Sequence, residues 1–118
     1  MMQLTKAEEQ IIQIIWELKK VNVKEIREKL PNPKPAINTV STIVRILENK
    51  GFVTHEQKGR GYVYFPIINK DEYTKQSLSK MINNYFDGSF KNLVSFFAKS
   101  NDLNINELEE IIDEINNK

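Results

Sequence analysis

The chain has 118 residues, with 17 lysines and arginines, 16 aspartates and glutamates, one histidine and no cysteine, and its formal net charge is +1. The absence of cysteine excludes disulfides, thiol nucleophiles and thiolate metal sites, and we expect no metal and no cofactor. The sequence shows neither a basic-then-apolar leader nor a run of about 20 apolar residues. We therefore expect a soluble, cytoplasmic protein with one compact domain, or a small domain with an appendage.

The small net charge conceals an uneven distribution along the chain. Residues 1–70 carry 12 basic and 7 acidic side chains, a net charge of +5, whereas residues 71–118 carry 5 basic and 9 acidic side chains, a net charge of −4. A total near zero therefore does not exclude binding to nucleic acid. We expect the two halves to have different electrostatic roles.

Two capping signatures predict the first two helices. Thr5 with Glu8 matches a capping box, in which each side chain satisfies a backbone N–H group at the start of a helix. Apolar residues at helical spacing then predict a helix over about residues 6–19. Asn22 with Glu25 repeats the signature before a helix of about two turns. The prolines of segment 31–35 end that helix, because proline has no N–H group and disfavours helix in the residue before it.

The third predicted helix, over about residues 36–50, has two contrasting faces. It ends at Gly51, the usual residue for a left-handed C-terminal cap. One face is an apolar stripe that we expect in the core, formed by Ile37, Val40, Val44 and Leu47 with Ile43 beside them. The opposite face carries Asn38, Ser41, Thr42 and Arg45. These are short hydrogen-bonding side chains and one long cation, not the Glu and Lys mixture of an ordinary solvated helix.

Two strands joined by a basic turn follow this helix. Residues 52–57 and 62–65 are rich in aromatic and β-branched side chains, and Pro66 closes the second strand. The segment between them, Lys58-Gly59-Arg60-Gly61, is a glycine-rich tip with two cations. His55 lies on the first strand, where we expect no special role for it.

From residue 69 onward the pattern is helical again. Asn69 with Glu72, Ser89, and Asn104 with Glu107 mark three further helix starts. These helices carry too much apolar surface to leave exposed and are too small for a robust core of their own. We expect them to pack against a second copy of the chain in a two-fold dimer. Packing onto the rest of the same chain is the alternative.

Three helices, a basic hairpin and further helices follow the order of a winged helix-turn-helix with an appendage. The predicted fold class is therefore mostly α with a small β-hairpin. We expect a winged-helix DNA-binding domain in residues 1–70 and a helical dimerisation domain in residues 71–118. In that architecture the third helix lies in the major groove and the hairpin tip contacts the DNA backbone, and a dimer presents two reading helices to a palindromic site.

The candidate site residues fall into three groups. Short polar side chains and arginine match the hydrogen-bonding groups of base edges, and the predicted base-reading residues are Asn38, Thr39, Ser41, Thr42 and Arg45. Cations suit phosphate, where charge matters more than geometry, and the predicted phosphate contacts are Lys34, Lys58 and Arg60. The predicted dimer interface consists of Tyr73, Met81, Tyr85, Phe86, Phe90, Leu93, Phe97, Leu108 and Ile112.

Two other interpretations compete with DNA binding. Taken singly, the polar helix face is also compatible with ordinary solvated surface and the glycine-rich hairpin with a soluble turn. The first competing interpretation is a protein-interaction module, in which the winged helix binds a partner protein. The net charge of +5 and the polar face of the third helix count against this interaction module. An enzyme is the least favoured class, because no paired carboxylates form a recognisable site and the only histidine lies on a predicted strand.

Several stretches of the sequence resemble the penicillinase-repressor group of winged-helix transcriptional regulators, the BlaI/MecI family with its copper-responsive CopY branch. The matching stretches are Leu4-Thr5-x-x-Glu8 with Ile14-Ile15-Trp16, Asn38-Thr39-Val40-Ser41-Thr42-Ile43-Val44, Leu47-Glu48-Asn49-Lys50-Gly51-Phe52-Val53, Tyr62-Val63-Tyr64, and Tyr85-Phe86-Asp87-Gly88-Ser89-Phe90 with Leu93-Val94. Together they span nearly the whole chain.

The resemblance implies a dimeric repressor that binds a palindromic operator and blocks transcription. It also implies release by a membrane sensor protease that triggers cleavage in the C-terminal region and breaks the dimer. The family's Asn–Phe cleavage position corresponds here to Phe96-Phe97. The C-terminus lacks the cysteine motif of the copper branch, so direct copper sensing is not expected. Where the family has an arginine before the leucine at 47, this chain has Ile46, with Arg45 one residue earlier.

Overall fold

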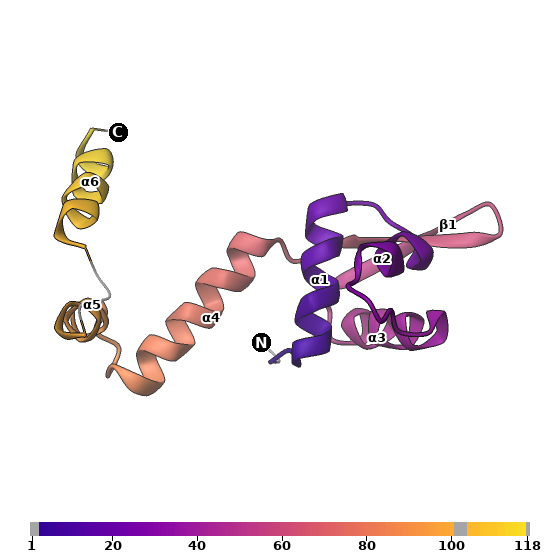
Figure 1. Cartoon of the computed structure of the whole chain (residues 1–118), viewed down its shortest axis with the longest axis horizontal. Helices are drawn as coiled ribbons and strands as arrows, with labels where there is room; N and C mark the ends of the chain where they lie inside the picture. Colours follow the sequence, from indigo (N-terminus) through magenta and orange to yellow (C-terminus); the bar gives the residue numbers. More distant parts are fainter. Residues whose placement is uncertain (1–2, 101–103, 118) are drawn as a thin grey trace. The chain divides into compact units, whose positions relative to one another are not determined.

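The structure is a computed structural model of the chain, and it describes residues 3–100 and 104–117. Within these residues it contains a two-stranded sheet and six helices (Figure 1). In chain order the elements are α1 (Lys6–Leu18), α2 (Val23–Lys29), α3 (Ile37–Asn49), β1 (Val53–Lys58), β2 (Gly61–Pro66), α4 (Lys70–Tyr85), α5 (Phe90–Lys99) and α6 (Ile105–Asn116). The predicted mostly helical fold with one hairpin is confirmed. None of the described helices has the length and apolar character needed to cross a membrane.

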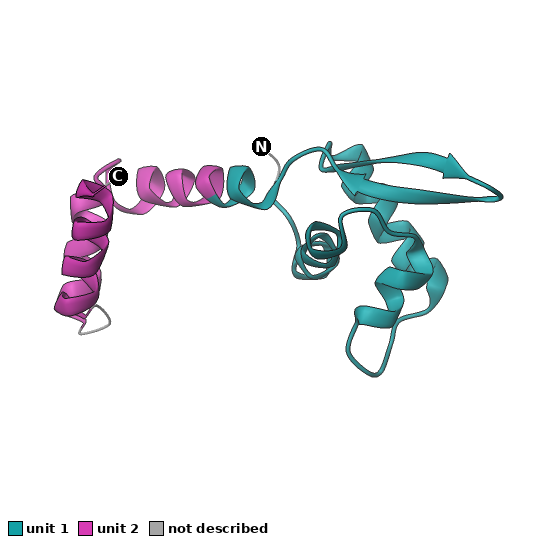
Figure 2. Cartoon of the chain, turned by 90° about the horizontal axis from the view of Figure 1, so that it is seen from above, with its two compact units in different colours: residues 1–74 teal, residues 75–118 magenta. Residues whose placement is uncertain are grey.

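The chain divides into two compact units, coloured separately in Figure 2. Unit 1 comprises Met1–Thr74 and unit 2 comprises Lys75–Lys118, so the boundary between them falls within α4. Each unit has its own packing and is described by itself below.

The helix starts of unit 1 form as their capping signatures predict. The Glu8 N–H donates to Thr5 Oγ1 at 3.2 Å, and the Thr5 N–H donates to Glu8 Oε1 at 3.0 Å. The same reciprocal pair joins Asn22 and Glu25, at 2.9 and 3.0 Å. Each box satisfies two backbone donors that the first turn of a helix leaves without partners.

Helix α3 ends in a Schellman motif at Gly51. The Gly51 N–H donates to the carbonyl of Glu48 and the Phe52 N–H to the carbonyl of Leu47, both at 3.0 Å. Gly51 has a φ of +85°, which L side chains rarely adopt, so the predicted left-handed cap is confirmed. The side chains of Leu47 and Phe52 are both fully buried, the apolar contact that accompanies this motif. The chain therefore leaves α3 in a fixed direction and enters β1.

The hairpin is antiparallel, and its second strand bonds to the connection between α1 and α2. Its register runs from Val53 opposite Pro66 to Lys58 opposite Gly61. Val21, in the connection between α1 and α2, exchanges two backbone hydrogen bonds with Tyr64 on β2, at 3.0 and 2.8 Å. This bridge holds the start of α2 beside the hairpin.

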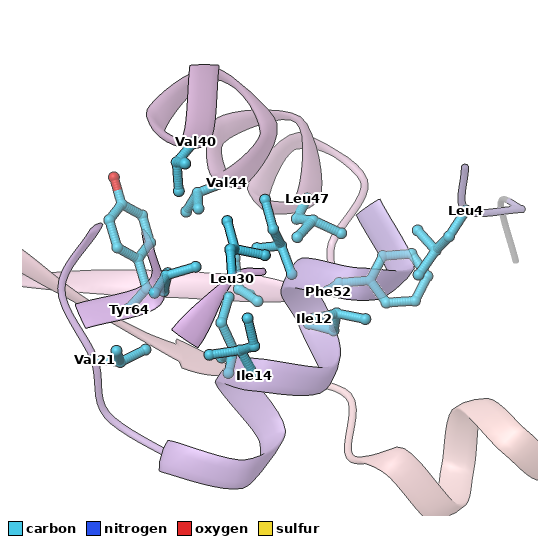
Figure 3. Packing of buried hydrophobic residues seen from close by; sticks show 14 residues of the cluster. Leu4, Ile12, Ile14, Val21, Leu30, Val40, Val44, Leu47, Phe52 and Tyr64 are labelled. Atoms are coloured by element: carbon cyan, nitrogen blue, oxygen red, sulfur yellow. The ribbon is translucent and has the colours of Figure 1, made fainter. Parts of the chain in front are cut away.

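The hydrophobic core of unit 1 lies where α1, α2 and α3 meet over the base of the hairpin (Figure 3). Val40, Val44 and Leu47 of α3 are fully buried there. The expectation that Ile37 continues their stripe is wrong, because its side chain is 39% exposed. Ile37 is the first residue of α3 and lies beside Lys24 and Arg27 of α2, at the end of the helix beyond the packed part of the core.

The first turn of α4 belongs to unit 1. The Tyr73 ring packs against the rings of Trp16 and Phe52, with centroid distances of 5.8 and 5.5 Å. Next to it, the Trp16 Nε1–H donates to the carbonyl of Ile68 at 2.8 Å. These contacts anchor the segment that leaves the hairpin onto α1.

Unit 2 is built from helices that leave most of their apolar side chains exposed. Ser89 caps α5 by accepting from the Asn92 N–H at 3.1 Å, and Asn104 caps α6 by accepting from the Asn106 N–H at 2.8 Å. Leu93 is the one buried hydrophobic residue among those described in the unit. Its exposed large apolar side chains are Leu78, Met81, Tyr85, Phe90, Phe96, Phe97, Ile105, Ile111, Ile112 and Ile115.

A partly buried ion pair joins the first turn of α1 to the end of α3. The Lys50 ammonium donates to both oxygens of the Glu8 carboxylate, at 2.6 and 3.0 Å, and Glu8 is only 4% exposed. Burial by itself raises the pKa of Glu8, but the hydrogen bonds from Lys50 and Thr5 and the charge of Lys50 outweigh it. The pKa of Glu8 is therefore lowered in the folded protein.

We expect Lys50→Met to lower the free energy of unfolding by about 2–3 kcal/mol at neutral pH, because it leaves the buried Glu8 carboxylate without its partner. A lowered folded-state pKa stabilises the fold above the unfolded-state pKa of about 4.3, and this stabilisation is lost as the pH falls through the folded-state value. The difference between variant and parent should therefore shrink below about pH 4. Urea unfolding at neutral and acidic pH measures it.

The matched control is Lys6→Met, which removes an exposed ammonium from the same region of α1. It should change the free energy of unfolding by less than about 0.5 kcal/mol at either pH. An equal loss in the two variants would contradict the assigned role of the Glu8–Lys50 pair.

Candidate nucleic-acid interface

The outer face of α3, defined by Asn38, Thr39, Ser41, Thr42 and Arg45, carries polar groups that the fold does not use. Ser41 is half-buried and the other four residues are exposed. The Thr42 Oγ1–H donates to the carbonyl of Asn38 at 2.9 Å. Among the described residues, the other four side chains take part in no hydrogen bond or ion pair. Most of the hydrogen-bonding capacity of this face is therefore available to a ligand.

The helical repeat arranges these residues in rows. At 3.6 residues per turn, Ser41 and Arg45 continue a row that begins at Ile37, and Asn38 and Thr42 form the neighbouring row. The row that starts at Ile37 faces the hairpin. Thr39 lies beyond the second row, on the side of α3 away from the hairpin. The structure thus brings the predicted base-reading residues onto one broad face, with Thr39 at its far edge.

A basic hollow separates α3 from the hairpin. Its volume is about 530 Å³, and it is lined by Asn22, Val23, Lys24, Ile37, Ser41, Arg45, Lys58, Gly61, Tyr62 and Tyr64. The charged residues of this lining are Lys24, Arg45 and Lys58, and no acidic residue is among them. Three cations around one concave surface create a positive potential that favours phosphate groups.

The tip of the hairpin displays its two cations. Gly59 and Arg60 form a two-residue turn between the paired residues Lys58 and Gly61, and of the two only Gly59 has a positive φ, +64°. This is the pattern of a type II′ turn, which needs glycine at its first position. Lys58 and Arg60 are exposed and make no ion pair with any residue that the structure describes. Both predicted cations are therefore available to an anion.

Lys34, the third predicted phosphate contact, is already engaged within unit 1. Its ammonium donates to the carbonyl oxygens of Arg27, Glu28 and Leu30, at 3.4, 2.9 and 2.6 Å. These bonds satisfy the last carbonyl groups of α2, where a cation also interacts favourably with the helix dipole. A phosphate contact by Lys34 has to compete with them.

The base of the hairpin is linked directly to α3. His55 Nδ1 lies within hydrogen-bonding distance of Glu48 Oε2, and the His55 ring packs edge-on against Tyr62 at a centroid distance of 4.7 Å. Burial and the charge of Glu48 raise the pKa of Tyr64, against a smaller opposing effect of Arg45. The Tyr64 hydroxyl therefore stays protonated. His55, for which we expected no special role, joins β1 to α3.

Sequence reasoning assigned no DNA-binding role to several residues that line the hollow, among them Lys24, Tyr62 and Ile37. In the sequence, nothing distinguishes Lys24 from the other lysines. Only the bridge between Val21 and Tyr64 brings the start of α2 to the hairpin. Tyr62 was assigned to a strand without a function, and Ile37 was assigned to the core.

Comparisons with known proteins identify the family of this chain. The sequence pattern of a known family, the penicillinase repressor family, matches residues 4–117. The penicillinase repressor of Bacillus licheniformis is 28% identical over 120 residues, which cover 98% of this chain and 94% of that protein. The methicillin resistance regulatory protein MecI of Staphylococcus aureus strain N315 is 26% identical over 117 residues, covering 98% and 95%.

A solved structure matches the N-terminal part of the chain. The solution structure of the DNA-binding domain of the repressor BlaI superimposes with a TM-score of 0.53 and 29% identity, covering 60% of this chain and 88% of that one. This likeness confirms the winged-helix fold predicted from the order of the elements.

The two hairpin glycines provide a test of the turn geometry. A Cβ atom added at either Gly59 or Gly61 meets no atom within 4 Å, but only Gly59 has a positive φ. We expect Gly59→Ala to lower the free energy of unfolding by about 1–2 kcal/mol through backbone strain. Gly61→Ala, the control, should be neutral or stabilising by up to about 1 kcal/mol. Chemical denaturation measures both, and equal effects would contradict the type II′ turn.

Proposed function

The chain belongs to the penicillinase repressor family, which is a family of transcriptional repressors, and from this premise we propose that it represses transcription by binding as a homodimer to a palindromic operator in double-stranded DNA. The observation that carries the proposal is that the outer face of α3, whose side chains make one hydrogen bond among the described residues, lies beside a hollow lined by three cations and no acid. Such a repressor acts where the chromosome lies, in the cytoplasm.

Two groups of contacts would set the affinity for the operator. The outer face of α3 supplies discrimination between bases, because a good bidentate pair contributes about 1–3 kcal/mol. Asn38 suits adenine and Arg45 suits guanine, and the hydroxyls of Ser41 and Thr42 suit several base edges. The cations Lys24, Lys58 and Arg60 would bind phosphate groups. They would add an affinity that depends on salt and is the same for any duplex sequence.

The exposed apolar side chains of unit 2 support the proposed dimer. The described part of α6 carries Ile105, Ile111, Ile112 and Ile115 as exposed apolar residues, with half-buried Leu108 on the same side. Their spacing places them on one face of the helix. A second copy of the chain would cover this face and the exposed aromatic residues of α4 and α5. Two linked reading helices then raise the effective concentration at the second half-site.

Derepression would follow from disruption of unit 2. Phe96 and Phe97, which correspond to the cleavage position of the family, lie within α5 and are both exposed. A protease needs an extended backbone, so α5 would have to open locally before cleavage by a sensor protease in the membrane. A monomer can bind only one half-site, so loss of the dimer would remove the affinity that comes from binding both half-sites at once. The protein would then leave the operator.

Three variants separate the two kinds of DNA contact. We expect Lys24→Ala and Lys58→Ala to weaken binding to operator and random duplex alike. Each should reduce the salt slope, which is the steepness with which the logarithm of the binding constant falls with the logarithm of the salt concentration, by about 1. Asn38→Ala should lose operator affinity by about tenfold or more while binding random duplex almost normally. Fluorescence anisotropy titrations at several salt concentrations measure these effects.

Lys29→Ala is the matched control, because it removes the same charge from a lysine that faces Glu17 of α1 at 4.0 Å. It should leave the salt slope nearly unchanged. Equal losses on both duplexes for Asn38→Ala would contradict its base-reading role. No binding of the parent protein to random duplex at low salt would contradict the proposal as a whole and would favour a protein-interaction module.

The dimer is tested by placing a charge in the apolar face of α6. We expect Ile112→Glu to sediment as a monomer and to lose operator affinity by about 100-fold, because burying an unpaired carboxylate opposes association. Asn106→Glu adds the same charge on the opposite side of α6 and should remain dimeric. Sedimentation velocity gives the oligomeric state, and a dimeric Ile112→Glu variant would contradict the proposed interface.

A further inference from the structure

Helix α3 begins with a large apolar side chain that the core does not bury. Ile37 is 39% exposed, although the buried residues Val40 and Val44 follow it in the sequence. It borders two open hollows, one of about 400 Å³ between α2 and α3 and the basic hollow of about 530 Å³ between α3 and the hairpin. Ile37 therefore buries less of its apolar surface than the core residues of α3, and its exposed part is accessible to a ligand.

Cations lie around Ile37, together with Val23, Tyr62 and Tyr64 in the larger hollow and Glu28 in the smaller one. Ser41 and Arg45 continue its row along α3, one and two turns further on. Lys24 borders both hollows, and Lys58 faces the larger one from the hairpin. Such a surface is complementary to the charge of a DNA strand. Ile37 is the exposed apolar residue of the α3 row that lines the larger hollow.

We propose that Ile37 reads a thymine in each half-site by contacting its C5-methyl group. This inference rests on the proposed function. The N-terminal residues of a reading helix contact base edges, and Ile37 is the first residue of α3. The thymine methyl group is the apolar feature that base edges present in the major groove. Cations on both sides of the hollow would hold the sugar-phosphate strand while Ile37 touches the methyl group.

The contact would add a selectivity that hydrogen bonds from α3 cannot supply. Asn38, Ser41 and Arg45 recognise donors and acceptors, whereas a methyl group offers neither. A cytosine at the same position has no methyl group, so Ile37 would favour thymine by the free energy of burying that one group. The apolar residue and the hydrogen-bonding residues would then read different base pairs.

The experiment removes the methyl group from the DNA and the side chain from the protein. The probe is a duplex selected by the parent protein from a random pool, with each thymine replaced in turn by deoxyuridine, which pairs identically but lacks the methyl group. We expect one position per half-site at which the replacement weakens binding about fourfold, the factor for burying one methyl group. With Ile37→Ala the two duplexes should bind equally, and Ile37→Val should give an intermediate ratio.

Ile46→Ala is the matched control. Ile46 is 38% exposed, on the same helix, and its position nine residues later turns it to the opposite side of α3. This variant should keep the fourfold ratio at the position that Ile37 reads. Circular dichroism confirms that each variant is folded.

The outcomes distinguish this inference from the proposed function. If the pool yields no selected duplex, sequence-specific DNA binding fails and the inference fails with it. If a duplex is selected but no thymine is sensitive to loss of its methyl group, only the reading by Ile37 is overturned. A sensitivity that persists in Ile37→Ala, or that disappears in Ile46→Ala instead, also overturns it.

Discussion

Three consecutive residues at the end of α3 set the direction in which the chain enters the hairpin. Gly51 supplies the positive φ that turns the backbone, Phe52 is buried directly after it, and Lys50 binds the carboxylate of Glu8 on α1. These contacts join α3 to α1 and to β1 at one point. A second link, between Glu48 and His55, holds the base of the hairpin against α3. The basic hollow exists because the hairpin is held at this angle.

The hydrogen-bonding groups of unit 1 are divided between the fold and one surface. In the described residues no buried side-chain nitrogen or oxygen lacks a hydrogen-bond partner, and residues such as Asn22, Arg27 and Lys34 are engaged by the backbone around them. The outer face of α3 is different, because it makes few bonds within the protein. Exposed polar groups without partners do not stabilise the fold, so their concentration on one face beside three cations indicates a ligand that is polar and negatively charged.

The two units contribute different physical properties to the proposed repressor. Unit 1 has a single packed core and a basic surface, whereas the described helices of unit 2 bury one hydrophobic residue and expose many. The charge differs in sign between them: residues 1–74 carry 12 basic and 9 acidic side chains, a net charge of +3, and residues 75–118 carry 5 basic and 7 acidic side chains, a net charge of −2. An acidic, apolar unit repels phosphate and favours protein partners. In the proposed repressor the contacts to DNA would thus come from unit 1 and the contacts between copies from unit 2.

The sequence by itself determined the features that depend on residues close together in the chain. Thr5 predicts the start of α1 and Gly51 the end of α3, because a cap forms within three or four residues and needs no distant partner. The tertiary structure alone decided the availability of three other side chains to a ligand. Lys34 folds back onto α2, Lys24 reaches the hollow and Ile37 stays outside the core. Each of these outcomes depends on how α2, α3 and the hairpin pack together, and periodicity within one helix carries no information about that.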